Sequence, residues 1–113
     1  MADSRELLSL LGMCRKANRL GCGHDAAVEA IRQGRASMCL LSSDSSQRLR
    51  DEIGREIAMN GRDIDLCVLE STMDEIKHAT GLRSAVLSIN DEGFAKSAYR
   101  LLKTNDGRKT NVK

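Results

Sequence analysis

The sequence predicts a single α/β domain, a three-layer α/β/α sandwich with a central mixed sheet of about four strands. Short apolar runs alternate along the chain with segments whose apolar residues recur at helical spacings. This alternation is typical of a sheet that is covered by helices on both faces. The chain has 113 residues, of which 41% are hydrophobic, so it can bury one core without disulfides or metal.

Two helices and a short strand are expected in the first third of the chain. Apolar residues fall at helical positions over 7–14, and a second helix fits residues 23–33. Gly34 follows this second helix and is suited to stop it. The segment 19–22 between the two helices would add a short strand to the sheet.

Three further strands and three further helices complete the predicted sandwich. The apolar run 37–42 predicts a strand buried on both faces, and the runs 63–70 and 84–91 predict two more. The helices that follow them are expected to start at Asp44, with Gln47 completing a capping box, at Ser71 or Thr72, and at Asp91. The strand residues expected in the core are Cys39, Leu40, Leu41, Leu66, Val68, Val86 and Leu87.

The formal net charge of +2 is unevenly distributed. Residues 14–35 and 96–113 are predominantly basic, whereas residues 44–75 are predominantly acidic. Such a distribution can create a positive face on a nearly neutral protein. The tail 104–113 is polar and basic without periodicity, so we expect a domain over 1–103 followed by a flexible basic tail.

Several classes of protein and site are disfavoured by the composition. Phe94 and Tyr99 are the only aromatic residues, which argues against a base-stacking platform. The sequence lacks an apolar run near 18 residues and a signal-peptide pattern, so we expect a cytoplasmic protein without a membrane span. The four cysteines lack a C-x-x-C pair and are expected to be small buried residues, with no metal and no cofactor.

A catalytic site is also not expected. His24 and Asp25 are adjacent in sequence, and neighbouring side chains at a helix start point apart. The sequence contains neither a G-x-S-x-G nucleophile motif nor a phosphate-binding P-loop. We therefore expect a binding protein rather than an enzyme.

The order of the segments resembles a known family. The stretch LLGMCRKANRLGCGHDAAVEAIRQGRASMCLLSSDSS, followed later by NDEGFAK, is similar to the L7Ae-type ribosomal protein family and, within it, to the small bacterial YlxQ-like branch. The resemblance covers about residues 7–102. It implies an α/β/α sandwich that binds structured RNA, often kink-turns, and that is often associated with ribosomes.

The resemblance also implies where RNA would bind. In kink-turn binders of the family, a glycine is followed by a small residue and Asn-Glu, and a lysine comes three residues after the Glu. The matching positions here are Gly23, His24, Asp25, Ala26 and Glu29. Three of them lack the family's chemistry, because Asp25, Ala26 and Glu29 stand where Asn, Glu and Lys are expected. Each such change can cost about 1–3 kcal/mol at a base contact.

These observations predict a small non-catalytic protein that binds structured RNA, such as ribosomal RNA, mainly through phosphates. The second RNA-facing loop implied by the resemblance is Gly81–Ser84, which contains Arg83. We expect one patch of cations near the start of the second helix, formed by Arg15, Lys16, Arg19, Arg32 or Arg35, and Arg83. Most of the acids of 44–75 should point elsewhere. The alternative is a protein-interaction adaptor that presents its acidic helices to a partner. The predicted RNA-binding residues are Arg15, Lys16, Arg19, Gly23, His24, Asp25, Arg32, Arg35 and Arg83.

Overall fold

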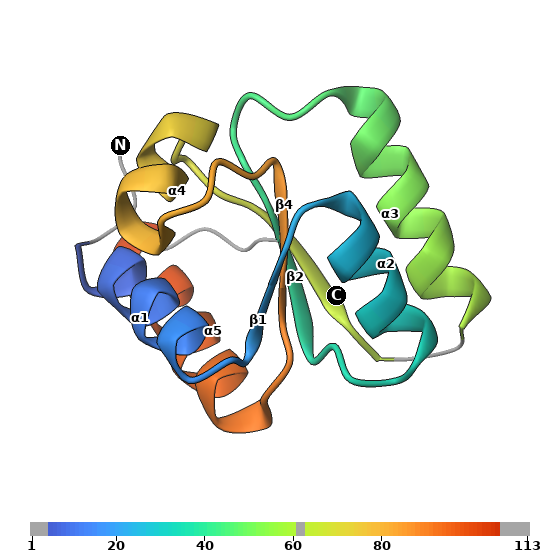
Figure 1. The fold of residues 1–113 in the computed structure, drawn as a ribbon, viewed down its shortest axis with the longest axis horizontal. Coiled ribbons are helices and arrows are strands. Elements are labelled where there is room, and N and C mark those ends of the chain that lie inside the picture. Colours follow the sequence, from blue (N-terminus) through green and yellow to red (C-terminus); the bar gives the residue numbers. More distant parts are fainter. Residues whose placement is uncertain (1–4, 61–62, 107–113) are drawn as a thin grey trace.

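The computed structural model, which describes residues 5–60 and 63–106, is the expected α/β/α sandwich (Figure 1). The tail beyond Asp106 lies outside the described residues. The elements in chain order are α1 (Arg5–Lys16), β1 (Leu20–Cys22), α2 (His24–Arg32), β2 (Met38–Leu41), α3 (Gln47–Met59), β3 (Asp65–Val68), α4 (Met73–Thr80), β4 (Val86–Ile89) and α5 (Glu92–Asp106).

The described strands form a mixed four-stranded sheet in the order β1-β4-β2-β3. β4 is antiparallel to both of its neighbours, pairing Ile89 with Leu20 of β1 and Leu87 with Leu40 of β2. β2 and β3 are parallel, as expected for strands joined by a helical crossover. The last strand in the chain therefore lies inside the sheet.

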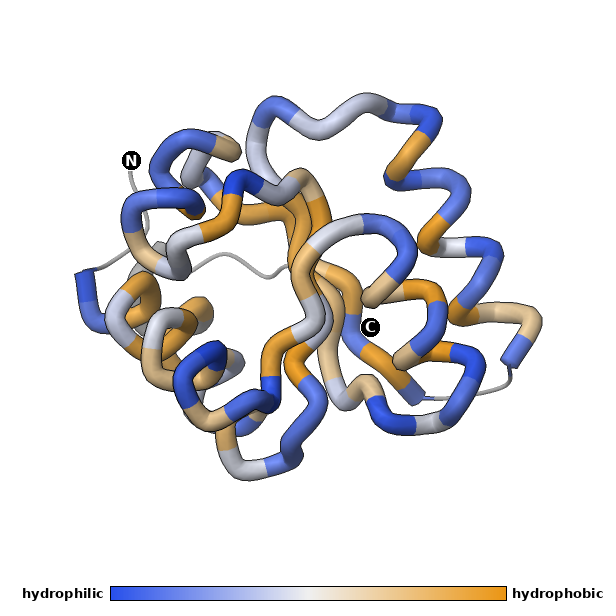
Figure 2. The backbone as a smooth tube through the Cα atoms, viewed as in Figure 1, coloured by the Kyte–Doolittle hydropathy of each residue, from blue (hydrophilic) through white to orange (hydrophobic). Residues whose placement is uncertain are grey.

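Helices cover both faces of this sheet (Figure 1). α2 and α3 pack on one face, and α1, α4 and α5 pack on the other. Side chains alternate along β2, so Met38 and Leu40 join the core under α1, whereas Cys39 and Leu41 join the core under α2. Figure 2 shows the hydrophobic residues concentrated along the central strands and the hydrophilic ones on the outer turns.

Most of the predicted helix ends are confirmed. Gly34 and Gly81 have φ angles of 76° and 94°, which suit glycine where a helix ends. Thr72 caps α4 through a capping box with Glu75, in which each side chain accepts a hydrogen bond from the other residue's backbone N–H. Asp91 accepts a hydrogen bond from the Phe94 N–H at 2.9 Å at the start of α5.

The predicted capping box of α3 is wrong. Ser46 caps this helix by accepting a hydrogen bond from the Leu49 N–H at 3.1 Å. Asp44 instead accepts a hydrogen bond at 3.1 Å from the N–H of Met73, the first residue of α4. Asp44 and Gln47 have the three-residue spacing of a capping box. However, Ser45 closes a turn by donating to the Ser42 carbonyl, so the N-cap lies two residues later than Asp44.

The prediction of the core is confirmed except on β3. Cys39, Leu40 and Leu87 are completely buried, but Leu66 is only partly buried and Val68 is 42% exposed. Val68 is the last residue of a strand at the edge of the described sheet, so it has a neighbouring strand on one side only. Helix α5 ends at Asp106, three residues beyond the expected end of the domain at residue 103.

The four cysteines form no disulfide. Cys14, Cys39 and Cys67 are buried, as expected, whereas Cys22 is partly buried. Burial raises the pKa of the Cys14 and Cys39 thiols to about 12, because a thiolate would lose its hydration there.

Candidate nucleic-acid interface

The sheet topology gathers four connecting segments at one edge. β1, β2 and β3 end there and β4 begins there, because β4 is antiparallel to β1 and β2. Backbone hydrogen bonds tie the segments together: the Gly23 N–H donates to the Val86 carbonyl, Ser42 to Ala85, and Ser43 to Ser71, at 2.8–2.9 Å. We call this region the four-loop edge; it comprises residues 23, 42–46, 69–72 and 81–85.

Helix α2 starts at this edge, but carboxylates surround its first turn. Gly23 has a φ of 96° and leaves open space where a side chain would be. The next residue, His24, contacts the Asp25 carboxylate at 3.0 Å through Nδ1 and the Glu52 carboxylate at 2.6 Å through Nε2. The pKa of His24 is raised, most by its hydrogen bond to Asp25 and next by its hydrogen bond to Glu52. A phosphate that approached this helix N-terminus would therefore meet negative charge.

The loop after α4 brings two arginines to another part of the edge. Arg83 lies in this loop, and its Nε donates to an Asp74 carboxylate oxygen at 2.8 Å. Arg15 extends from α1 to the same loop, where its Nη1 donates to the Thr80 carbonyl at 2.9 Å. The Arg15 Nη1 also lies 3.1 Å from the position that a Cβ on Gly81 would occupy. Two of the predicted cations thus lie at one loop.

A close helix contact positions Arg15. A Cβ on Gly12 would lie 2.7 Å from the Ala79 carbonyl oxygen, so α1 and α4 approach each other through the missing side chain. Arg15 comes three residues after Gly12, and Thr80 follows Ala79 directly. Partly buried Cys22 adjoins this cluster. Its pKa is raised mainly by burial, and the charge of Arg15 and a hydrogen bond with Ser84 oppose this increase.

Three of the predicted cations lie away from the four-loop edge. The Arg19 carbonyl accepts a hydrogen bond from the Asn90 N–H, at the opposite end of β1 and β4. Arg32 is the last residue of α2, about 12 Å along the helix from its start. Arg35 comes after α2 and donates to the Gln33 side chain at 3.0 Å. The prediction of one patch is therefore wrong for these arginines, because β1 and α2 place them at the other end of the molecule. Lys16 is exposed at the end of α1.

Three acids of residues 44–75 contact predicted RNA-binding residues, whereas most of these acids are expected to lie elsewhere. Glu56 forms a two-bond ion pair with Arg32, with distances of 3.0 and 2.7 Å. Glu52 contacts His24, and Asp74 contacts Arg83. The helices α2 and α3 lie side by side on one face of the sheet, so acids of α3 meet the outer residues of α2 (Figure 1).

Arg50 also belongs to this edge, although it is not among the predicted residues. Its Nε donates to the Ser45 hydroxyl at 3.0 Å and its Nη2 donates to the Ser43 carbonyl at 3.1 Å. Arg50 therefore holds the serine-rich segment 42–46 in the edge. The sequence contained a clue, because Arg50 lies one turn inside a helix that follows SSDSS.

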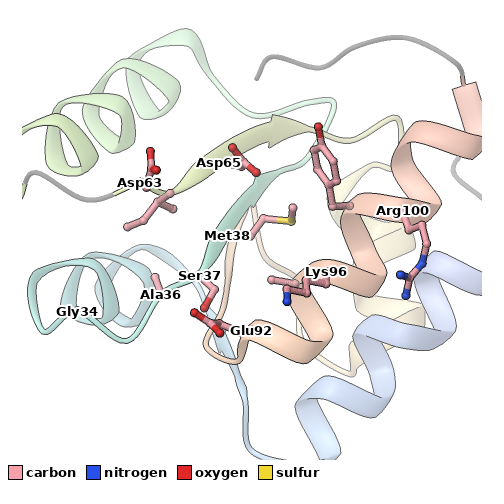
Figure 3. A pocket seen from close by; sticks show the side chains of 12 residues that line it. Gly34, Ala36, Ser37, Met38, Asp63, Asp65, Glu92, Lys96 and Arg100 are labelled. Atoms are coloured by element: carbon pink, nitrogen blue, oxygen red, sulfur yellow. The ribbon is translucent and has the colours of Figure 1, made fainter. Parts of the chain in front are cut away.

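A groove of about 950 Å³ lies at the opposite edge of the sheet (Figure 3). Its lining includes Lys96 and Arg100 of α5. It also includes Asp65, the first residue of β3, and Asp63, which precedes that strand. None of the predicted RNA-binding residues lines this groove. Among residues 5–60 and 63–106, no group of three or more His, Cys, Asp or Glu side chains could hold a metal ion. No helix within the described part of the chain is long and apolar enough to cross a membrane.

Two solved structures resemble this chain. A protein of unknown function from Bacillus halodurans has a TM-score of 0.79 and 24% identity, and the match covers 88% of this chain and 99% of that one. The Giardia lamblia 15.5kD RNA binding protein has a TM-score of 0.66 and 12% identity, and the match covers 94% and 92% of the two chains. No protein-family model and no curated protein matches the sequence. The chain thus shares its fold with a Bacillus protein of unknown function and with an RNA-binding protein of Giardia.

Proposed function

We propose that the protein is a non-catalytic RNA-binding protein that contacts structured RNA through the four-loop edge. The observation that carries this proposal is the placement of Arg15 and Arg83 at one loop. Arginine is well suited to bind phosphate because its guanidinium presents several donors in a fixed plane. The fold shared with the Giardia RNA-binding protein supports the same function.

The contacts at the start of α2 favour binding to phosphates over reading of bases. Asp25 is fully exposed and negatively charged, and Ala26 has no polar side-chain atom. The Glu29 carboxylate accepts a hydrogen bond from Gln33 at 3.1 Å. An ionised carboxylate at position 25 or 29 can neither donate to an RNA base nor pair with a phosphate, and the methyl group of Ala26 can do neither. We therefore expect weak, salt-dependent binding without strong preference for kink-turns.

The finer assignment also belongs to this proposal. The order of sequence segments and the sandwich fold together support membership of the L7Ae-type ribosomal protein family. Within that family, the YlxQ-like branch is proposed from the order of sequence segments alone. The partner would then be structured RNA such as ribosomal RNA, and the protein would act in the cytoplasm.

A titration with two RNAs tests the proposal. A labelled kink-turn RNA and a kink-disrupted control are titrated at two salt concentrations with the unmutated protein, Arg83→Ala and Arg32→Ala. Arg83→Ala should weaken binding to both RNAs and reduce the salt slope by about 0.7–0.9, the value for one lost phosphate contact. Arg32→Ala is the matched control, because Arg32 lies outside the four-loop edge and pairs with Glu56. It should bind like the unmutated protein.

Other outcomes would contradict parts of the proposal. Equal losses for Arg83→Ala and Arg32→Ala would show that net charge, and not this edge, determines binding. A kink-turn preference of a hundredfold or more, roughly 2.7 kcal/mol, would show that the first turn of α2 reads bases. No binding of either RNA at low salt would reject RNA binding in favour of the adaptor function.

A further inference from the structure

Arg83 is flanked by two carboxylates, one from the first turn of α4 and one from the loop after β2. Asp74, in the first turn of α4, accepts a hydrogen bond from its Nε at 2.8 Å. Asp44, from the loop after β2, accepts the Met73 N–H next to Asp74. The Ser42 side chain, the Met73 N–H and the charge of Arg83 lower the pKa of Asp44. One cation thus lies beside two anions.

This arrangement has a consequence for any phosphate that approaches. The group of Arg83, Asp44 and Asp74 has a net charge of −1 when all three are ionised. The Arg83–Asp74 pair is exposed, with 56% and 75% of the two side chains accessible, so water and ions can reach it. Exposed pairs of this kind are weak and exchange readily. A phosphate can therefore displace the Asp74 carboxylate from Arg83, but only in competition with it.

We propose that Asp74 is an intramolecular competitor of RNA phosphate at Arg83 and limits the affinity of the four-loop edge for RNA. This inference rests on the proposed RNA-binding function and assigns a role to a residue with opposite charge. The carboxylate occupies Arg83 in the unbound protein and is released when RNA binds.

Asp74, rather than Asp44, is the residue to change. Asp44 bonds to the backbone of α4, so its removal would disturb the edge itself. Helix α4 is capped by Thr72 and Glu75 without help from Asp74. Asp74→Asn keeps the size of the side chain and removes its charge, so the fold should be retained. A thermal melt of the variant verifies this.

The experiment measures RNA affinity at low salt for the unmutated protein, Asp74→Asn, Arg83→Ala, the double variant and Glu56→Gln. Asp74→Asn should bind about threefold more tightly, the size expected when a weak exposed ion pair no longer competes. Glu56→Gln makes the same charge change and releases Arg32, away from the four-loop edge. This control should bind like the unmutated protein.

The double variant shows whether Asp74 changes RNA affinity through Arg83. If Asp74 acts through Arg83, Asp74→Asn should have no effect in the Arg83→Ala background. A gain that persists there, or an equal gain for Glu56→Gln, would show a general charge effect and overturn the inference. If the unmutated protein binds RNA through Arg83 but Asp74→Asn gains nothing, the inference alone fails. If the unmutated protein does not bind RNA, both proposals fail.

Discussion

Two helix glycines provide a matched test of the packing that positions the four-loop edge. Gly12 lies in α1 and Gly54 lies in α3, both inside helices. Replacement of a helix-interior glycine with alanine normally stabilises by about 0.5–1 kcal/mol, because alanine loses less conformational freedom on folding. A Cβ on Gly54 has nothing within 4 Å, so Gly54→Ala should show this full gain.

Gly12→Ala should have the opposite effect. Its Cβ would lie 2.7 Å from the Ala79 carbonyl oxygen, whereas ordinary contact begins at 3.4 Å. The neighbour is backbone, so α1 and α4 must move apart by about 0.7 Å, and overpacking of this kind costs about 1–3 kcal/mol. After the propensity gain, we expect a loss of up to about 2 kcal/mol in the free energy of unfolding.

Urea denaturation followed by circular dichroism measures both variants. The Gly54→Ala midpoint should rise and the Gly12→Ala midpoint should fall, with similar slopes. If Gly12→Ala is as stable as Gly54→Ala, the close contact between α1 and α4 does not constrain the fold, and the account of how Arg15 reaches Thr80 is wrong. Gly12→Ala should also weaken RNA binding, because it shifts the carbonyl that holds Arg15.

Three further results are expected. In an NMR titration the pKa of His24 should lie above 6.5, and it should be lower in the Glu52→Gln variant. Because the pKa is raised in the folded state, the unmutated protein should be more stable than the His24→Gln variant. This difference in stability should be greatest below pH 6.5 and be lost as the pH rises through the folded-state pKa. An unchanged pKa in Glu52→Gln would contradict the 2.6 Å contact. Thr72→Ala should lower the unfolding free energy by about 0.5–2 kcal/mol, measured by urea denaturation, because α4 loses its N-cap; no loss would mean that the capping box is dispensable. With a thiol reagent at pH 8, Cys14 and Cys39 should react only after unfolding, because burial raises their pKa to about 12; rapid reaction in the native protein would refute their burial.

The features predicted correctly from the sequence depend on residues close together in the chain. The capping box of Thr72 and Glu75 spans four residues, and the glycine after α2 acts on the helix directly before it. Asp44 was assigned to the wrong helix because its partner, the Met73 N–H, is distant in sequence and is brought near only by the fold. The exposure of Val68 likewise depends on the order of strands, which the apolar run does not contain.

The candidate site was harder to predict than the fold for the same reason. The proximity of Arg15 and Arg83 requires the packing of α1 on α4, and the pairing of Arg32 with Glu56 requires the packing of α2 on α3. Charge clusters along the sequence contain arginines that the fold places at different ends of the molecule. They could not separate arginines at the four-loop edge from those that lie at the opposite end of α2.

The position of β4 affects how the protein can fold during synthesis. β1 is synthesised early, but its strand partner in the described sheet is β4. Leu20 can therefore pair with Ile89 only after β4 has been synthesised. β2 and β3 can pair before then, whereas the four-loop edge requires the Val86 and Ala85 carbonyls. A nascent chain that stops before residue 86 therefore has an incomplete sheet, in which β2 and α2 lack the strand that packs against them. We expect such a chain to remain open to chaperones until its final helix is nearly made.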